Sequence, residues 1–241
     1  MPRFCAAGGV VDELEISDER KFTAGPECAD AALAWLRHLC LPDPVFPVGV
    51  VNSLYYDTLP LHSYEEKRAG DFIKTKVRLR WYDVAEAAAD GTCVAFLEVK
   101  RRVGRGRRKW RKKLNLDWDW ISKSPVDDEG FCDVLAEARE AMSGAFPTDL
   151  HPAAVISYTR YRFLCPETMA RVCIDMNVAT GRVSNRYLPF RGQARLSDIV
   201  LEIKDTSRDV PRWVERLYRL GYRQGSCSKY GECIARLMED G

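Results

Sequence analysis

Basic and apolar side chains alternate along residues 74–81, which read KTKVRLRW. Successive side chains of a β-strand point to opposite faces, so this segment predicts a strand with cations on one face and apolar groups on the other. Similar alternation occurs at residues 98–100, 158–162 and 202–204. A sheet of such strands must pack its apolar face on a core. If the charged rows face inward, they form an anion-binding channel.

A solvated outer face is the structural alternative for each single strand, because Lys and Arg are common on the polar side of antiparallel sheets. Rows of like charge on neighbouring strands are destabilising, however, unless a polyanion or carboxylates offset them. The recurrence of the pattern in at least four segments therefore favours a functional role.

The length and the charge balance set limits on the function. With 241 residues, 46% of them hydrophobic, the chain can bury a sizeable core, and we expect one domain over residues 1–241. Lys and Arg number 37 and Asp and Glu number 35, which leaves a net charge of +2. This balance argues against nucleic acid as a partner, because the basic character is confined to particular strands.

The cysteines and histidines give no sign of a metal centre. The nine cysteines form no CxxC pair, and the three histidines lack zinc-site spacing, so we expect buried free thiols. Neither a leader peptide nor an apolar run of membrane-spanning length occurs in the sequence. We therefore expect a cytoplasmic protein without a transmembrane segment, either a monomer or a small homo-oligomer.

Strands dominate the expected secondary structure. We expect strands at residues 13–23, 48–57, 72–83, 92–103, 107–118, 153–164, 171–178 and 200–204. Helices are expected at 25–39, 61–68, 128–142 and 211–220, an exposed connection at 84–91 and a turn at 104–106. Many strands with inserted helices favour an α+β fold, in which a closed or nearly closed antiparallel β-barrel has helices packed outside.

The ordered motifs of the chain resemble a known family. They are ERKF at 19–22, SLYYDT at 53–58, KVRLRWY at 76–82, FLEVK at 96–100, KWR at 109–111, YTR at 158–160, RVCID at 171–175, LEIK at 201–204 and SKY at 228–230. Together they resemble the VTC (vacuolar transporter chaperone) domain, the catalytic domain of polyphosphate polymerases among the triphosphate tunnel metalloenzymes. The resemblance covers nearly the whole chain and is greatest to the stand-alone bacterial type.

The resemblance implies transfer of the γ-phosphate of ATP to a growing inorganic polyphosphate chain inside a basic tunnel. ADP is released, Mn²⁺ or Mg²⁺ is the cofactor, and pyrophosphate can act as primer. The implied catalytic cations are Arg78, Arg80, Lys100, Arg160 and Lys229. The expected substrate-binding residues are Lys21, Lys76, Lys109, Tyr158, Arg171, Lys204 and Ser228. The implied metal ligand is Glu202, with Glu19 and Glu98 as further candidates.

Each assignment has a physical reason and an alternative. Arg offers phosphate a planar fork of donors and Lys a mobile point charge, but either can instead form a salt bridge inside the barrel. For Glu202 the alternative to a metal is an ion pair with Lys204. At the fifth expected strand, Lys109, Arg111, Lys112 and Lys113 all remain candidates for the tunnel-facing cation.

The chemistry needs no strong general base, because the end of a polyphosphate chain is already an anion. This agrees with the lack of a Ser, His or Cys constellation in the sequence. Phosphoryl transfer depends mainly on positioning and on stabilisation of charge, and fixed cations with one divalent ion supply both.

Two other functions remain open. Hydrolases of the same superfamily carry a Glu-x-Glu-x-Lys run, whereas here Ser17 replaces the first Glu. Glu19, Glu98 and Glu202 can still share metals, or Glu19 and Glu98 can separate adjacent cations. A non-catalytic module that binds polyphosphate, inositol phosphates or RNA is the alternative of another class.

Overall fold

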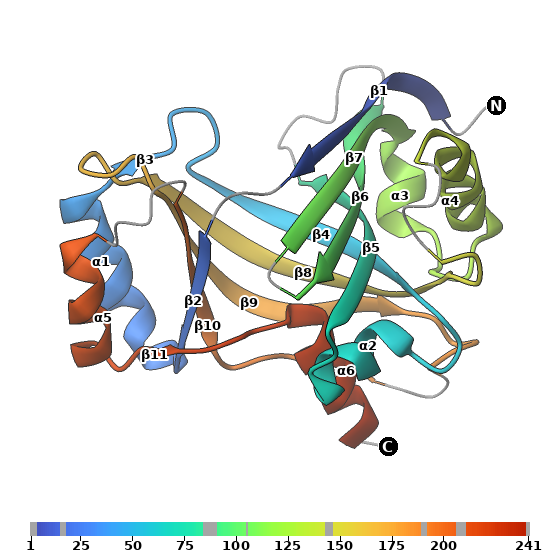
Figure 1. The fold of residues 1–241 in the computed structure, drawn as a ribbon. Coiled ribbons are helices and arrows are strands. Elements are labelled where there is room, and N and C mark those ends of the chain that lie inside the picture. The colour runs from blue at the N-terminus through green and yellow to red at the C-terminus, as the bar shows by residue number, and fades with distance from the viewer. Residues whose placement is uncertain are drawn as a thin grey trace.

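The computed structural model describes residues 4–14, 18–83, 91–104, 106–142, 147–188, 192–205 and 211–239. They form one curved antiparallel sheet of eleven strands, with most of the helices against its outer side (Figure 1). The expected α+β class is therefore confirmed. No helix in these ranges is long and apolar enough to cross a membrane.

The elements follow the chain in the order of their numbers. The strands are β1 (Phe4–Leu14), β2 (Asp18–Ala24), β3 (Leu41–Pro42), β4 (Val48–Asp57), β5 (Ile73–Tyr82), β6 (Thr92–Val103), β7 (Gly106–Asp117), β8 (His151–Leu164), β9 (Arg171–Val183), β10 (Ile199–Asp205) and β11 (Arg223–Gln224). The α-helices are α1 (Ala29–Leu39), α2 (His62–Ala69), α3 (Trp118–Lys123), α4 (Glu129–Ala141), α5 (Glu215–Arg219) and α6 (Lys229–Glu239). Two 3₁₀ turns, Pro26–Cys28 and Arg212–Val214, precede α1 and α5.

The sheet curves strongly but does not close. Its strand order is β1-β7-β6-β5-β4-β8-β9-β10-β2-β11, with β3 paired to β8, and no ladder joins the two ends within the described residues. The expected barrel is therefore only partly confirmed. The chain that follows β11, Gly225–Ser228, crosses the open side toward α6 (Figure 1). It reads GSCS and lacks the alternating apolar residues that a closing strand needs.

The strand expected at residues 13–23 is divided between two strands that lie in different parts of the sheet. Glu13 of β1 lies opposite Lys109 of β7, whereas Lys21 of β2 lies opposite Glu202 of β10. Residues 15–17, between the two strands, lie outside the described residues. Alternation of side chains runs through both strands, so the sequence pattern did not reveal the change of partner.

Most other expected boundaries lie within one or two residues of the observed ones. The exceptions include β9, which continues to Val183, and β1, of which only the last two residues were expected. Helices α3 and α6 were not expected. Asp117 ends β7 and caps α3 by accepting a hydrogen bond from the Trp120 backbone N–H. Of the connection at 84–91, residues 84–90 lie outside the described residues, as does residue 105 in the turn at 104–106.

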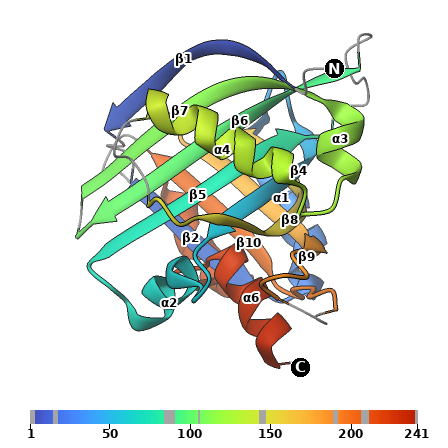
Figure 2. The same ribbon diagram turned by 90° about the vertical axis from the view of Figure 1, so that its right-hand side faces the viewer.

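Four helices, α1, α3, α4 and α5, bury their apolar faces against the outer side of the sheet. α3 and α4 cover β5–β7 through Trp120 and Phe131, and Figure 2 shows α4 lying across these strands. α1 and α5 cover β2, β9 and β10 through Leu36 and Leu217. α6 packs against the inner face instead, where Ile234 joins a third core group with Tyr55 of β4 and Tyr158 of β8. Each such buried side chain contributes about 1.5–3 kcal/mol. The part of the inner face that α6 does not cover is thereby left to polar groups.

Candidate functional site

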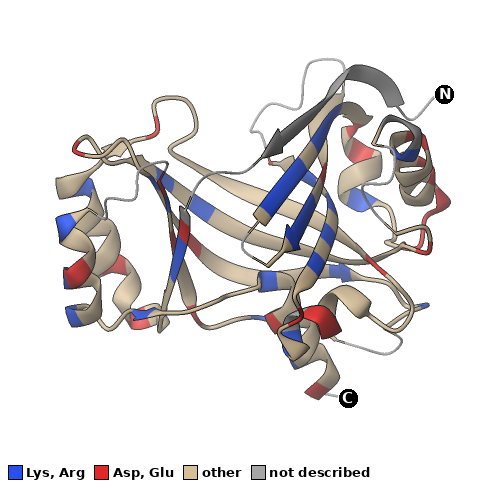
Figure 3. Ribbon diagram, viewed as in Figure 1, with Lys and Arg blue, Asp and Glu red and all other residues tan. Residues whose placement is uncertain are grey.

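The strand register brings charged side chains into rows across β5, β6 and β7. Lys76, Lys100 and Lys109 lie opposite one another, and the neighbouring row consists of Arg78, Glu98 and Arg111. Figure 3 shows the basic residues of these strands gathered along the curved sheet. The intervening residues, among them Val77 and Leu79, are buried in the outer core. The alternation in the sequence therefore becomes one charged inner face and one apolar outer face.

Lys76, Lys100 and Arg78 of these rows line a cavity of about 790 Å³, to which β2, β4, β5–β8, β10 and the chain before α6 contribute. Its lining includes fourteen Lys and Arg side chains but only two Glu side chains. The structure brings together here twelve of the expected site residues, which are Glu19, Lys21, Lys76, Arg78, Arg80, Lys100, Tyr158, Arg160, Glu202, Lys204, Ser228 and Lys229. A cavity with this excess of positive charge attracts anions.

Glu98 lies beneath the lining and is surrounded by cations. Its carboxylate is 2.7 Å from an Arg78 amino nitrogen, 3.8 Å from Arg80, and 3.5 Å from both Lys109 and Arg111. Burial alone would raise the pKa of Glu98, but these cations outweigh burial and hold it well below its usual range. Because both oxygens face cations, the contacts favour Glu98 as a spacer between cations over Glu98 as a metal ligand.

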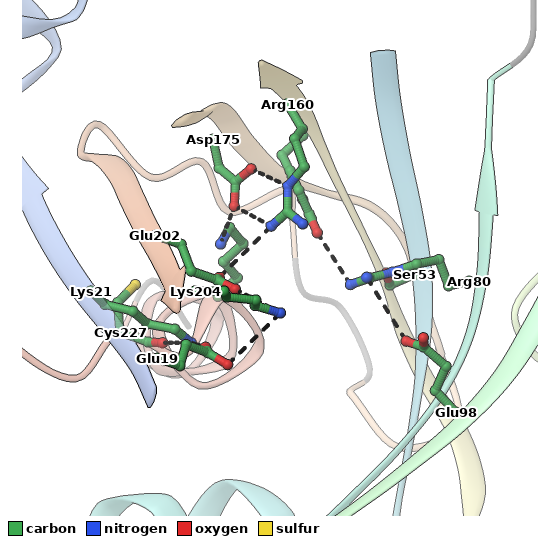
Figure 4. Close-up of polar contacts among 12 residues, drawn as sticks. Glu19, Lys21, Ser53, Arg80, Glu98, Arg160, Asp175, Glu202, Lys204 and Cys227 are labelled. Carbon is green, nitrogen blue, oxygen red and sulfur yellow. Dashed lines mark hydrogen bonds and ion pairs between the residues drawn. The ribbon is translucent and has the colours of Figure 1, made fainter. Parts of the chain in front are cut away.

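Arg80 and Arg78 are held by hydroxyl groups as well as by Glu98. Arg80 donates to Ser53 Oγ at 3.2 Å and to the Tyr158 hydroxyl at 3.2 Å (Figure 4). Arg78 donates to the Tyr55 hydroxyl at 3.3 Å. These contacts fix the planar donor groups while leaving both side chains on the cavity wall.

Tyr55 is a cavity residue that the sequence analysis missed. Burial opposes ionisation of its phenol, but the charges of Arg78, Arg80 and Lys76 outweigh burial and lower the pKa of Tyr55 to about 8. Its ring stacks on Tyr230 of α6 at 4.8 Å between centroids. The hydroxyl therefore reports directly on the positive potential of the cavity.

Asp175 of β9 is a second buried carboxylate that the sequence analysis did not single out. It accepts two hydrogen bonds from Arg160, at 2.6 and 2.7 Å, and lies 2.6 Å from Lys229 Nζ (Figure 4). Burial would raise the pKa of Asp175, but the charges of Arg160 and Lys229 lower it. Asp175 is fully buried and thus orients two cations of the cavity from behind.

Glu202 and Glu19 are the two carboxylates of the cavity lining, and both lie near Lys204. Lys204 Nζ is 3.0 Å from Glu202 and 3.9 Å from Glu19, while Lys21 lies 2.8 Å from Glu19 (Figure 4). Burial and their mutual repulsion oppose ionisation of this pair. Lys204 and Lys21 outweigh both effects, so the pKa of Glu202 is held well below its usual range and that of Glu19 is lowered.

Residues 224–228, which we term the strap, complete the cavity on the open side of the sheet. At one end the Gly225 N–H donates to the Lys21 carbonyl at 3.0 Å, and Lys21 Nζ donates to the Cys227 carbonyl at 3.3 Å. At the other end Lys76 Nζ donates to Ser228 Oγ at 2.7 Å. The strap therefore bridges β2 and β5 without forming a ladder between them.

The residues of the SKY motif have three separate tasks. Ser228 caps α6 by accepting from the Gly231 N–H at 3.2 Å. Lys229 pairs with Asp175, and its ammonium also lies 4.9 Å from the centre of the Tyr158 ring. Tyr230 donates to Asp57 at 2.8 Å and thereby anchors α6 to β4. The helix that this motif begins was not expected from the sequence.

Two of the expected cations lie outside the cavity lining. Arg171 is exposed on β9, and Lys109 lies opposite Lys100 and contacts Glu98. Of the alternatives to Lys109, Arg111 also reaches Glu98, whereas Lys112 pairs with Glu137 of α4 at 3.1 Å on the outer side. Lys113 is exposed and lies opposite Phe96.

Several lining residues were not predicted as site residues. Besides Tyr55 they include Arg20, Lys74, Arg101, Arg102, Arg107, Arg108 and the strap residues 224–227. The alternation at 74–81 had already marked Lys74, and the arginines near residue 105 were visible as a basic run. The strap gave no signal, because its contribution depends on where the chain crosses the sheet.

The arrangement can bind a chain of phosphates and stabilise charge on a transferred phosphoryl group. Among the described residues there is no group of three or more His, Cys, Asp and Glu side chains that could hold a metal ion. Glu19 and Glu202 are nevertheless a carboxylate pair facing the anion-binding cavity. This fits a Mg²⁺-type ion, which commonly takes one or two carboxylates plus phosphate oxygens.

The fold and the cavity define the chain as a curved-sheet protein with an internal basic face. The VTC domain model matches residues 48–238, and the chain belongs to the VTC domain family. No protein of curated function gives a significant match.

Solved structures align with this chain at low sequence identity. A "putative adenylate cyclase" from Bacillus halodurans aligns with a TM-score of 0.53 and 14% identity, covering 90% of this chain and 95% of that one. A second protein so described, from Vibrio parahaemolyticus, has a TM-score of 0.43 and 12% identity, covering 90% and 97%. The first similarity supports the fold alone.

Proposed function

We propose that this protein is a metal-dependent polyphosphate polymerase, which transfers the γ-phosphate of ATP to the end of an inorganic polyphosphate chain and releases ADP. The observation that carries the proposal is the cavity of a VTC-family chain, in which fourteen cations face two carboxylates. Such a cavity suits a substrate with many phosphates, because each oxygen can meet a donor.

The cations divide the work of binding and transfer. Arg78, Arg80 and Arg160 are fixed by Glu98 and Asp175 and offer donors to the transferred phosphoryl group. Lys100, Lys229 and Lys21 neutralise the remaining phosphates as point charges. Because the guanidinium groups are fixed before the substrate binds, little reorganisation is needed when charge develops in the transition state.

The remaining expected substrate contacts come from several elements. Tyr158 offers a hydroxyl beside Arg80. Lys76 and Ser228, which are hydrogen-bonded to each other where the strap ends, offer an ammonium and a hydroxyl. Lys204 balances the two lining carboxylates. Lys109 and Arg171, which lie outside the lining, are proposed as contacts for chain phosphates near the ends of the cavity.

Glu202, with Glu19 beside it, would hold Mn²⁺ or Mg²⁺ together with phosphate oxygens. Bound there, the ion would supply positive charge to the β- and γ-phosphates. We assign Glu98, the third candidate ligand of the sequence, to holding Arg78 and Lys109 apart. Both Glu202 and Glu19 have lowered pKa values, so they are ionised and ready to bind a cation at neutral pH.

The acceptor needs orientation more than deprotonation. A terminal phosphate of polyphosphate is an anion and can attack in line once the surrounding cations hold it against the γ-phosphate. The bond between the β–γ bridging oxygen and the γ-phosphorus breaks, a new P–O–P bond forms at the acceptor, and ADP leaves with the bridging oxygen.

The test is to incubate the protein with ATP, pyrophosphate as primer and Mn²⁺ or Mg²⁺, and to resolve the products by chain length. Long polyphosphate with a matching amount of ADP supports the proposal. The double variant Arg78→Ala, Arg80→Ala should lose both ATP binding and turnover, whereas Arg216→Ala, Arg219→Ala on exposed positions of α5 should retain both. Unchanged nucleotide affinity in the first variant contradicts the cavity assignment.

The same assay separates the two alternatives. Orthophosphate as the sole product identifies a tunnel hydrolase, for which the Glu19–Glu202 pair could hold metal beside a water. Binding of polyphosphate without any turnover, unaffected by Glu202→Ala, identifies a non-catalytic module.

A further inference from the structure

The positive charge of the cavity extends beyond the expected phosphate-binding row toward the end of the β6–β7 pair. Lys74, Arg102 and Arg107 lie opposite one another on β5, β6 and β7, two residues further along than Lys76, Lys100 and Lys109. A two-residue step along a strand restores the same face and advances by about 7 Å. We name Lys74, Arg102 and Arg107 the outer row.

The outer row differs from the inner one in how its charges are balanced. In the row of Arg78, Glu98 lies between Arg78 and Arg111 and contacts both. For Lys74, Arg102 and Arg107, no carboxylate of the described residues lies within 4.0 Å of a side-chain nitrogen. Arg102 instead donates to the Gly104 carbonyl at 2.7 Å. Like charges directly opposite on neighbouring strands are destabilising, so an anionic ligand is the natural counterpart of this row.

The outer row lines the same cavity as Arg78, Arg80 and Arg160, and an anion can therefore reach it without leaving the site. A triphosphate held at the inner rows is too short to occupy this additional step as well. We propose that Lys74, Arg102 and Arg107 form an exit subsite for the phosphates of a long inorganic polyphosphate chain. The identity of the polyanion rests on the proposed function; the position and chemistry of the subsite rest on the register and the charges.

Single-stranded RNA is the competing polyanion, and the cavity suits it less. RNA binding without sequence preference relies on aromatic faces on which bases stack. The two aromatic side chains of the cavity lining are already covered, because Tyr55 stacks on Tyr230 and the Tyr158 ring carries the Lys229 ammonium. A ligand without bases needs no such platform.

The test compares ligand lengths in the triple variant Lys74→Gln, Arg102→Gln, Arg107→Gln. Calorimetry measures the Kd of tripolyphosphate, long-chain polyphosphate and polyuridylate at two salt concentrations. We expect the affinity for long-chain polyphosphate to fall about tenfold, with a shallower salt dependence, because three phosphate contacts and their counterion release are lost. The affinity for tripolyphosphate should change by less than about threefold, since the inner contacts remain.

Two controls separate the subsite from general effects. Arg37→Gln, Arg216→Gln, Arg219→Gln removes the same charge at exposed positions on α1 and α5 and should leave all three affinities unchanged. Lys74→Arg, Arg102→Lys, Arg107→Lys keeps the charge and should restore long-chain binding. The Tm of the glutamine variant should be no lower than that of the parent, because its outer row no longer carries three like charges.

Three outcomes overturn the inference. They are an equal loss for tripolyphosphate and long-chain polyphosphate, no loss for either, and a loss confined to polyuridylate. These measurements involve no turnover. If the parent protein binds both phosphates but makes no polyphosphate from ATP, the proposed function fails while the exit subsite can still be confirmed.

Discussion

Asp175 connects two cations that are far apart in the sequence. It is fully buried and pairs with Arg160 of β8 and with Lys229 at the start of α6. We expect Asp175→Asn to destabilise the ligand-free protein by about 3–5 kcal/mol, because two buried cations lose their shared carboxylate. Urea denaturation measures this difference, and Asp133→Asn at an exposed position of α4 is the matched control.

The same variant has a distinctive response to ligand. Saturating tripolyphosphate supplies negative charge to Arg160 and Lys229, so the difference in unfolding free energy should shrink when the ligand is present. An equal difference with and without tripolyphosphate would show that Asp175 acts on the core and not on the cavity.

Tyr55 gives the cavity a spectroscopic reporter. With a pKa of about 8 in the folded protein, its phenol should ionise near that pH, and phenolate absorbance that is absent in Tyr55→Phe measures the transition. The unfolded state retains the proton up to about pH 10, so this group adds stability as pH rises from 8 toward 10 and loses it as pH falls through 8. Tyr218→Phe, at an exposed position, should leave the transition in place.

Tripolyphosphate should raise the pKa of Tyr55, because the bound anion neutralises the charges of Arg78 and Lys76 that lower it. A titration curve that is the same with and without tripolyphosphate would contradict the placement of the anion beside Tyr55.

Among single residues, the sequence predicted those side chains whose position follows from the alternation within one strand. Arg78 and Arg80 could be predicted because alternation alone places them on the charged face. Asp175 could not, because its role depends on β9 lying beside β8 and on α6 returning to the sheet. A buried carboxylate that orients cations from other elements can therefore be identified only from the tertiary structure.

The strap is the element whose contribution to binding can be tested most directly. Gly225→Pro removes the N–H that donates to the Lys21 carbonyl, and we expect a roughly fivefold loss of tripolyphosphate affinity, equivalent to one hydrogen bond. Gly225→Ala is the matched control, because a Cβ at this position meets no atom within 4 Å. Calorimetry measures the Kd of tripolyphosphate for both variants. Equal values would mean that the attachment of the strap to β2 does not shape the cavity.

Elements were predictable where a local pattern is sufficient. The alternation at 92–103 predicted both ends of β6 correctly, and Asp128 marked the start of α4. β1 and β2 were merged because their partners, β7 and β10, are chosen by packing and not by local sequence. For the same reason the sequence favoured a barrel, whereas the observed sheet leaves one side to the strap.

For the whole molecule, buried carboxylates set the response to acid. Cations hold the pKa of Glu98, Glu202 and Asp175 below the usual values of 4.5 and 3.8, so their stabilising contribution is complete above those values. It is lost as pH falls through the lowered pKa values in the folded state. Urea denaturation at stepwise lower pH should therefore show the free energy of unfolding falling steeply below about pH 4.

Glu98→Gln identifies the source of this acid sensitivity. The variant should be less stable at neutral pH, because four cations lose a common partner, and its stability should fall less steeply in acid. Glu27→Gln at an exposed position should follow the parent curve. Parallel acid curves for Glu98→Gln and the parent would rule out Glu98 as a main contributor.

The strap and Lys229 also have a consequence for the order in which the protein acquires its site during synthesis. The hydrogen bond from Lys21 to the Cys227 carbonyl joins residues 206 positions apart, and Lys76 to Ser228 joins residues 152 apart. A nascent chain that has not yet reached Gln224 already carries most of the cations but has neither the strap nor Lys229, the second partner of Asp175. Such a chain offers anions an open basic trough, so an abundant cellular polyanion can meet the cations before the cavity has formed around them.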